Sequence, residues 1–455
     1  MIGSMSLANL AQQLNGQLTG GDVSFNNLST DTRNIHPGDA YLALVGERFD
    51  GNDFVADACE RGAAAAIIST PQNADLPLLQ VADTHQALAQ IALGNRLRSE
   101  ARVIALTGSQ GKTTVKEMLA AILAKAGPTL YTSANLNNTI GVPLTLLRLD
   151  KSHRYAVIEM GANSQGEIAF SVKAARPDMA LITNASDAHV EGFGSLQGIV
   201  EAKGEILDGL QGEGKALLNA DDPNVGQWIK RAGAHHVVLF SYDNKSGQAA
   251  YYARKVSIGE QGRVAFELQS PLGAQAVSLR LLGKHNVFNA VAAAAAAIET
   301  GASLQQVADG LADCEAVPGR LMPLTGINGS TIVDDSYNAS PASFFAAIDV
   351  LMTFKGKKIL VAGDMKELGS NSAEAHFAVG NYAREAAVDE LWAVGEASQQ
   401  TVAGFGAAGR LFPGQEELIK AGEAVADENT VFLIKGSRGS RMDVLVEALR
   451  KKGGE

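Results

Sequence analysis

A short apolar run that passes through a glycine-containing loop into a helical pattern constrains this chain more than any other feature. It reads VIALTGSQGKTTVKEMLAAIL, residues 103–123. Gly108 and Gly111 let backbone N–H groups approach phosphate oxygens, and a helix that begins near Lys112 adds partial positive charge at its N-terminus. Lys112 would neutralise the phosphates, and the Thr113 hydroxyl would bind Mg²⁺. The pattern predicts a strand, a phosphate-binding loop and a helix in an α/β fold.

Two further patterns bear on what kind of phosphate chemistry this is. Leu106 stands where the usual phosphate loop has its first glycine, so a tight turn with a solvated lysine is the alternative to nucleotide binding. The only Asn-Lys pair continues as NKSG, without the aspartate of a GTPase base-reading motif. Glu159 ends the apolar run YAVIE, where an acid can bind metal or merely end a strand. A GTPase switch is therefore disfavoured.

Length and charge limit the remaining classes. The 455 residues predict about three domains, and the net charge of −11 gives no long-range attraction to nucleic acid or anionic membrane. The first residues lack the basic start and apolar segment of a secretory signal, and the run at 290–298 is too short to cross a bilayer. We expect a cytoplasmic, soluble monomer with no nucleic-acid partner and no membrane insertion.

Apolar runs alternate with helical patterns and suggest where the domains divide. Residues 1–83 predict a small α/β domain, and residues 84–316 predict a central, mostly parallel sheet flanked by helices. Within the latter, RVAFELQS and AVSLRLLG alternate like an antiparallel hairpin. The segment AVPGRLMPL marks a boundary, after which residues 317–455 repeat strand–loop–helix units in a Rossmann-like pattern.

Two side chains downstream of the loop remain ambiguous from their surroundings alone. His189 lies in the glycine-rich stretch DAHVEGFGS, where imidazole could bind a metal, but a lone loop histidine is more often a surface residue. Lys203 lies between Glu201 and Glu205, a pattern that is more typical of a solvated helix face.

A series of short motifs in fixed order resembles the Mur ligase family over nearly the whole chain. The motifs are TGSQGKTT, NLNNTIGVPLTLL, VIEMGAN, DAHVEGFGS, EAKGEI, LLNADDPN, GKHNVFNAVAAAA, PGR, DDSYNASPAS, GDMKELG and KGSR. The resemblance implies that residues 1–83 bind a UDP substrate and that residues 84–316 bind ATP. It implies that residues 317–455 bind the amino substrate and close over the nucleotide.

The resemblance also implies an activity. It is strongest to the ligases that add D-alanyl-D-alanine to UDP-N-acetylmuramoyl-tripeptide through an acyl phosphate, an ADP-forming step of peptidoglycan precursor synthesis. The implied partners are therefore D-alanyl-D-alanine and UDP-N-acetylmuramoyl-tripeptide, and the implied cofactors are ATP and two Mg²⁺ ions. The alternatives are the ligase that adds the third amino acid, folylpolyglutamate synthase, and a nucleotide-binding ATPase without ligase activity.

The resemblance assigns roles to matched positions. The implied catalytic residues are Lys112, Glu159, His189 and Lys203, and the implied metal ligands are Thr113, Glu159, His189 and a carbamylated Lys203. The implied ATP site comprises Gly108, Ser109, Gly111, Lys112, Thr113, Thr114, Asn286, Asn289, Arg320, Asp335 and Tyr337. The implied substrate residues are Thr32, Arg33, Arg48, Phe49, Asp50, Asn137, Asn138, Asn338, Lys435, Ser437 and Arg438.

Overall fold

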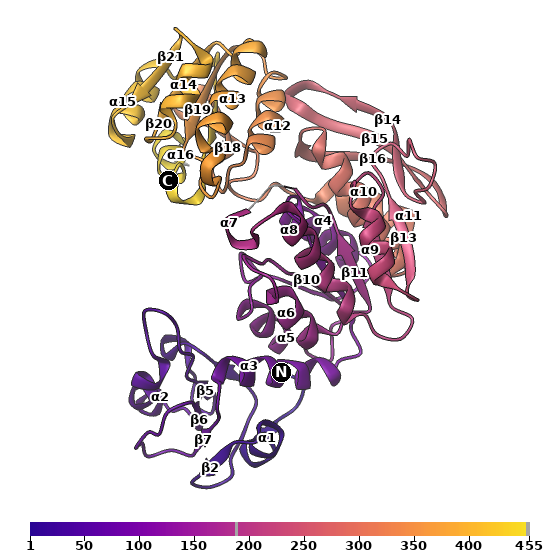
Figure 1. Ribbon diagram of the computed structural model, residues 1–455, viewed down its shortest axis with the longest axis vertical. Helices are drawn as coiled ribbons and strands as arrows, with labels where there is room; N and C mark the ends of the chain where they lie inside the picture. Colours follow the sequence, from indigo (N-terminus) through magenta and orange to yellow (C-terminus); the bar gives the residue numbers. More distant parts are fainter. Residues whose placement is uncertain (187–189, 452–455) are drawn as a thin grey trace.

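The protein consists of three α/β bodies that follow one another along the chain (Figure 1). The computed structural model describes residues 1–186 and 190–451. The first and the C-terminal bodies lie at opposite ends of the molecule, and the central body lies between them. Helix α3 (Thr84–Leu97) lies between the first sheet and the central helices α5 and α6.

The first body is built on a five-stranded sheet in the order β2-β7-β6-β5-β4, in which only β2 runs antiparallel to its neighbour. Strands β1 and β3 form a separate antiparallel pair. The elements are β1 (Met5–Ser6), α1 (Leu7–Leu14), β2 (Gln17–Thr19), β3 (Ser24–Phe25), β4 (Leu28–Ser29), η1 (Thr32–Asn34), β5 (Ala40–Leu42), η2 (Gly51–Phe54), α2 (Val55–Glu60), β6 (Ala65–Ile68) and β7 (Leu78–Gln80).

The central body carries a six-stranded, wholly parallel sheet in the order β13-β12-β11-β8-β10-β9. The interiors of its middle strands are apolar and buried, as expected where helices cover both faces of a sheet. Ile104 and Leu106 of β8 pack toward α4, α10 and α11, and the alternate residues Val103 and Ala105 pack toward α3, α5, α6 and α8. The elements are β8 (Arg102–Thr107), α4 (Lys112–Ala124), β9 (Thr129–Tyr131), α5 (Gly141–Leu147), β10 (Tyr155–Glu159), α6 (Glu167–Ala175), β11 (Met179–Ile182), α7 (Val190–Phe193), α8 (Leu196–Gly204), η3 (Glu205–Gly209), β12 (Lys215–Asn219), α9 (Val225–Ala232), β13 (His236–Phe240), α10 (His285–Glu299) and α11 (Leu304–Asp313).

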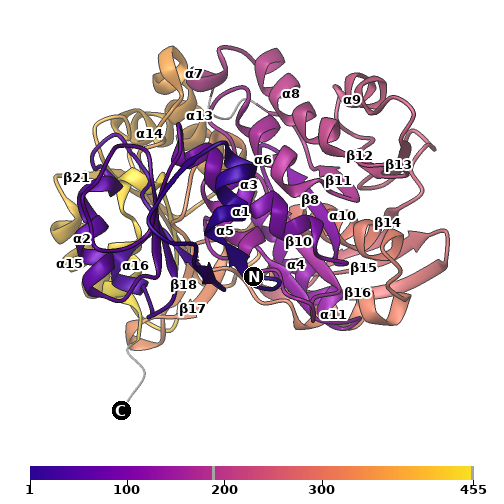
Figure 2. The same cartoon turned by 90° about the horizontal axis from the view of Figure 1, so that it is seen from below.

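A three-stranded antiparallel sheet completes the central body. Strands β14 (Tyr252–Ile258), β15 (Arg263–Ser270) and β16 (Gly273–Leu282) lie in that order, with the short turn η4 (Glu260–Gly262) between the first two. They lie on the side of the central body away from the first body in both views (Figure 2). The predicted hairpin is confirmed by the pairing of β15 with β16.

The C-terminal body has a six-stranded sheet in the order β17-β18-β22-β19-β20-β21, parallel except for β17. Strand β22 is inserted between β18 and β19, so the carboxyl ends of these three strands meet at one edge. The elements are β17 (Met322–Thr325), η5 (Ile327–Gly329), β18 (Thr331–Asp335), α12 (Pro341–Leu351), β19 (Lys357–Gly363), η6 (Gly369–Asn371), α13 (Ser372–Glu385), β20 (Glu390–Val394), α14 (Gln399–Phe405), β21 (Gly409–Phe412), α15 (Gln415–Val425), β22 (Thr430–Lys435), η7 (Arg438–Ser440) and α16 (Asp443–Leu449).

The three-part α/β architecture with a central parallel sheet confirms the predicted fold class. The five-stranded, central and C-terminal sheets fall within the three predicted domains, whose bounds stay a prediction. Within the described ranges, no helix has both the length and the apolar character that crossing a membrane requires.

Candidate active site at the phosphate loop

The candidate site lies where three central strands end side by side. After β8 the chain builds β9 and β10 on one side of that strand, and then β11, β12 and β13 on the other. The order of strands therefore reverses at β8, and ligands of open parallel sheets bind in the crevice at such a point. Residues 108–111, which connect β8 to α4, lie at this crevice.

The phosphate loop is pressed between two side chains from distant parts of the sequence. Gly111 has a φ of 80°, and a Cβ at this position would lie 2.5 Å from Asn289 Oδ1. A Cβ at Gly108 would collide with Thr183 Oγ1. Asn289 donates a hydrogen bond of 2.9 Å to Asn286 Oδ1, so the two predicted asparagines support one face of the loop.

The end of β11 holds the loop through hydrogen bonds that the sequence did not reveal. Gln110 is bound on both sides of its backbone: Thr183 Oγ1 donates to its carbonyl at 2.7 Å, and Asn184 Oδ1 accepts from its N–H at 3.0 Å. Ser109 Oγ donates to the carbonyl of Ser186 at 3.1 Å. The polar residues that end the run MALITN were the available signal for this clamp.

The Lys112 side chain folds back over the phosphate loop and donates hydrogen bonds to it. Its Nζ donates to the carbonyls of Gly108 at 2.7 Å and Ser109 at 3.4 Å. Burial lowers the pKa of Lys112, the Glu159 carboxylate opposes that shift, and Arg320 adds to it. The ammonium is therefore held without a full counter-charge at the place where a phosphate would bind.

Glu159 has one oxygen that is satisfied and one that is not. The side chain is 1% exposed, and its Oε1 accepts hydrogen bonds from Asn137 Nδ2 at 2.7 Å and Thr113 Oγ1 at 3.3 Å. Its Oε2 is buried and has no hydrogen-bond partner. A buried carboxylate oxygen without a partner is costly unless a cation completes it, so Thr113 and Glu159 fit Mg²⁺ as hard oxygen ligands.

Thr113 and Glu159 are two of the four predicted metal ligands, and the other two are His189 and Lys203. His189 lies outside the described residues. Elsewhere in the described chain, no group of three or more His, Cys, Asp or Glu side chains gathers as a metal cluster.

Lys203 on α8 is buried rather than solvated. It is 3% exposed, its Nζ lies 5.3 Å from the centre of the Phe193 ring, and no described residue gives it a hydrogen bond or ion pair. Burial lowers its pKa to about 7, the nearby Lys112 contributes, and Glu167 and Glu205 oppose the shift. The solvated helix face that the sequence pattern favoured is therefore wrong.

The C-terminal body reaches the loop through its first residues. Arg320 Nη2 donates to Thr113 Oγ1 at 3.2 Å, and its guanidinium lies 4.5 Å from the centre of the Tyr337 ring. Gln110 Nε2 also lies 3.5 Å from Ser340 Oγ. Arg320 thus joins Lys112 in the charged region around Glu159, and the domain boundary becomes part of the site.

Two predicted residues of the C-terminal body pair with each other. Lys435 Nζ lies 2.6 Å from Asp335 Oδ2 and donates to the carbonyl of Asn338 at 2.9 Å. Burial raises the pKa of Asp335, and the Lys435 charge opposes that shift. The Arg438 guanidinium lies 5.7 Å from the centre of the Tyr337 ring, so Arg438 and Arg320 lie against the same aromatic side chain.

The predicted UDP-side residues form a separate, open group on the first body. Arg33 is 83% exposed and pairs only locally with Asp31 at 2.7 Å. Phe49 is 56% exposed at the tip of a tight loop in which Gly46 N–H donates to the Phe49 carbonyl. Asp50 accepts from the N–H of Asn52 at 2.9 Å, and the other members of this group are Thr32 and Arg48.

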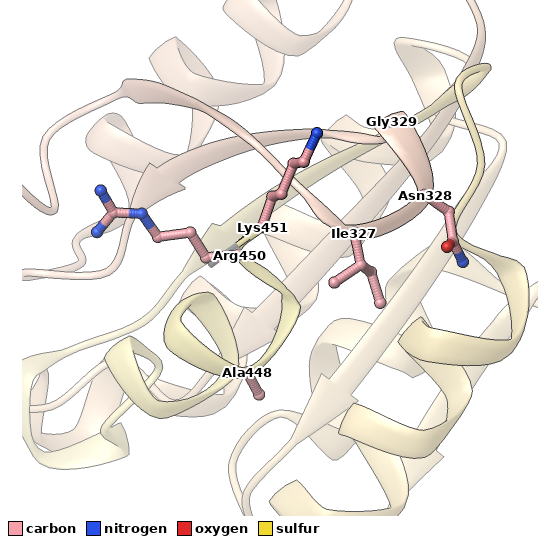
Figure 3. A pocket seen from close by; sticks show the side chains of 6 residues that line it. All are labelled: Ile327, Asn328, Gly329, Ala448, Arg450 and Lys451. Carbon is pink, nitrogen blue, oxygen red and sulfur yellow. The ribbon is translucent and has the colours of Figure 1, made fainter. Parts of the chain in front are cut away.

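A hollow in the C-terminal body has a different set of lining residues (Figure 3). It is lined by Ile327, Asn328, Gly329, Ala448, Arg450 and Lys451, where η5 meets the end of α16. None of the predicted site residues lines it, so the hollow is not the candidate active site.

Comparisons with known proteins match the chain almost end to end. Three family models match, described as Mur ligase family, catalytic domain (residues 24–96), Mur ligase middle domain (residues 106–297) and Mur ligase, glutamate ligase domain (residues 319–438). The chain is 44% identical over 452 residues to the UDP-N-acetylmuramoyl-tripeptide--D-alanyl-D-alanine ligase of Escherichia coli (strain K12), with 99% of each chain covered. The chain belongs to the Mur ligase family.

Solved structures of Mur ligases share the fold. The crystal structure of MurF from Acinetobacter baumannii has a TM-score of 0.92 and 36% identity, covering 99% of this chain and 100% of that one. MurF from Thermotoga maritima in complex with ADP has a TM-score of 0.83 and 28% identity, covering 93% of this chain and 96% of that one.

Because Lys203 is buried in this Mur ligase, we expect that replacing it with an uncharged side chain stabilises the folded protein by an amount that depends on pH. Lys203→Met should raise the free energy of unfolding below pH 7 by about 2 to 4 kcal/mol, because the folded wild type there holds a buried ammonium. From pH 7 up to 10.5 the unfolded lysine binds a proton that the folded one has released. Wild-type stability therefore rises with pH, and the advantage of the variant shrinks. Urea unfolding in CO₂-free buffer with EDTA measures this, and an advantage that is independent of pH would contradict it.

Substitutions of the adjacent residues Asn137 and Asn138 should affect different properties, activity in the first case and stability in the second. Asn137 holds Glu159, whereas Asn138 Oδ1 accepts from the N–H of Gly141 at 2.8 Å at the start of α5. Asn137→Ala should lower kcat/KM by roughly 10- to 100-fold, as loss of a residue behind a metal ligand does. Asn138 stands among the substrate residues that the resemblance implies, but its oxygen is occupied by the start of α5, so Asn138→Ala should cost about 1 kcal/mol of unfolding free energy with a much smaller kinetic effect. Steady-state kinetics and urea unfolding of both variants test the division, and the opposite pattern would refute it.

Proposed function

We propose that this Mur ligase joins D-alanyl-D-alanine to the terminal carboxylate of UDP-N-acetylmuramoyl-tripeptide and converts ATP to ADP and phosphate. The full-length similarity at 44% identity supports the substrate pair. The observation that carries the chemistry is the charged region in which Lys112 and Arg320 lie with the buried carboxylate of Glu159, and in which the charge of Lys112 lowers the pKa of Lys203.

The first step brings two anions together. A carboxylate oxygen of the tripeptide attacks the γ-phosphorus of ATP, the bond from that phosphorus to the bridging oxygen breaks, and ADP leaves with the electron pair. Lys112 and Arg320 offset the charge that accumulates on the phosphoryl oxygens, and the backbone N–H groups of residues 108–111 fix them in place. The acyl phosphate is the product of this step.

In the second step the free amine of the dipeptide attacks the acyl carbon. The C–O bond to the phosphoryl group breaks, phosphate leaves, and the amine loses a proton as the amide forms. Water must be kept from the acyl phosphate, or hydrolysis competes. The exposed residues of the first body and the Arg320–Tyr337 face of the C-terminal body are then brought together by closure of the bodies over the loop.

We assign one Mg²⁺ position to Thr113 and Glu159, because Glu159 Oε2 lacks a partner. A bound Mg²⁺ supplies positive charge that screens the reacting anions and orients the phosphates. A second position would use Glu159 with His189 and Lys203. An ammonium cannot bind a cation, so Lys203 must first change its charge.

Carbamylation gives Lys203 that change. Its neutral amine attacks CO₂, a C–N bond forms, and a proton is released, leaving a carboxylate at the end of the side chain. Burial without an anionic partner and the pKa of about 7 both favour the neutral amine that this reaction needs.

The substrate assignments follow the bodies. We place the UDP part at Thr32 and Arg33, with Arg48, Phe49 and Asp50 toward the peptide arm. We place the amino substrate near Asn338, Lys435, Ser437 and Arg438, and the adenine between the α10 asparagines and Tyr337. The enzyme would act in the cytoplasm as a monomer. The ligase that adds the third amino acid is not favoured, because the full-length relative carries the dipeptide ligase name.

The test is release of phosphate from ATP in the presence of UDP-N-acetylmuramoyl-tripeptide, with and without D-alanyl-D-alanine, followed by the mass of the product. We expect release that depends on both substrates and a product heavier by one dipeptide less water. Turnover with a single amino acid and a UDP-N-acetylmuramoyl-dipeptide would move the assignment to the preceding ligase. Hydrolysis that ignores both substrates would refute ligase activity.

A further inference from the structure

A buried histidine in the C-terminal body takes no part in the chemistry above. His376 lies on α13 and is 1% exposed. Its Nε2 accepts a hydrogen bond of 2.9 Å from the N–H of Met365, and its Nδ1 lies 2.7 Å from the carbonyl of Ser372. A carbonyl oxygen can only accept, so Nδ1 carries the proton and Nε2 is bare. The two partners therefore require the neutral imidazole in one tautomer.

The peptide that His376 holds is also held from its other side. Met365 N–H and the carbonyl of Asp364 belong to the same planar peptide unit and point in opposite directions. That carbonyl accepts from Ser437 N–H at 3.0 Å, Ser437 Oγ at 2.6 Å and Ser440 Oγ at 2.9 Å. His376 thus fixes the plane of a peptide whose carbonyl accepts from three donors of Ser437 and Ser440, the residues on either side of Arg438 at η7.

The η7 turn carries Arg438, whose guanidinium lies 5.7 Å from the Tyr337 ring. The same ring receives Arg320, which bonds Thr113 beside the phosphate loop. Rotation of the Asp364–Met365 peptide would withdraw the acceptor from Ser437 and Ser440. The turn would then lose its anchor at the carboxyl end of β19.

We propose that His376 is a positioning residue, whose bare Nε2 fixes the Asp364–Met365 peptide and thereby holds the Ser437–Ser440 turn and Arg438 in the substrate-binding face. This inference rests on the proposed function, since that function gives Arg438 its ligand. It predicts an effect on the substrates bound by the C-terminal body and little effect on the UDP substrate, whose residues lie on the first body.

Two substitutions each keep one of the two ring contacts. In His376→Gln the side-chain amide reaches as far as Nε2 and keeps an acceptor for Met365 N–H. In His376→Asn it reaches only as far as Nδ1 and keeps the donor to Ser372. Both lose the ring and differ in the contact that the proposal requires. Ser440→Ala removes one donor from the other side of the same peptide and leaves α13 intact.

The experiment measures kcat and the three KM values for the wild type, both His376 variants and Ser440→Ala, together with amide hydrogen exchange over residues 364–369 and 436–441. We expect His376→Asn and Ser440→Ala to raise KM for the dipeptide and ATP by roughly tenfold, the loss of about one hydrogen bond. The KM for the UDP substrate should stay unchanged in these variants. The kcat and KM values of His376→Gln should stay within about twofold of those of the wild type. Protection of the Met365 amide should be lost in His376→Asn and kept in His376→Gln.

Equal impairment of the Gln and Asn variants, or a larger loss in Gln, would overturn the proposal. So would a His376→Asn variant with all three KM values unchanged. If the wild type itself shows no dipeptide-dependent turnover, the proposed function fails instead, and the exchange pattern still decides whether His376 holds the peptide and the turn.

Discussion

The structure depends on positive charge that is gathered at the end of β8 without matching negative charge. Lys112 and Arg320 lie in one region with the buried carboxylate of Glu159; Arg320 contributes to the lowered pKa of Lys112, and Lys112 contributes to the lowered pKa of Lys203. An isolated protein gains nothing from holding like charges close together, and burying the Lys203 ammonium without an ion-pair partner among the described residues costs free energy. The arrangement becomes favourable when phosphate and carboxylate groups enter, so the folded chain is preorganised to bind anions.

Each body contributes to this charge in a different way. The central sheet supplies the loop and clamps it through Thr183 and Asn289. Arg320 of the C-terminal body contacts the loop, and Arg438 lies against the same Tyr337 ring as Arg320. The first body keeps its predicted contacts exposed at the other end of the molecule. A central body that carries the loop, with a predicted binding face on each outlying body, suits a reaction that must bring three substrates together and exclude water.

Local sequence predicted what depends on local geometry. The strand, loop and helix around TGSQGKTT and the hairpin of β15 and β16 follow from periodicity and glycine placement. Burial of Lys203 did not follow, because its glutamate neighbours are typical of a surface helix and only packing in the folded chain buries α8 there. The different duties of Asn137 and Asn138, and the clamp by Thr183, depend on strand order, which no short window of sequence contains.

The central claim is that this charged region joins a carboxylate to the γ-phosphoryl group before the amine attacks. The most direct measurement uses UDP-N-acetylmuramoyl-tripeptide with ¹⁸O in both oxygens of its terminal carboxylate, followed by mass analysis of the phosphate released in the complete reaction. Formation of an acyl phosphate predicts one ¹⁸O in each phosphate, because the attacking oxygen leaves with phosphorus when the amide forms. Phosphate without ¹⁸O would show that ATP is cleaved by water and would contradict the account.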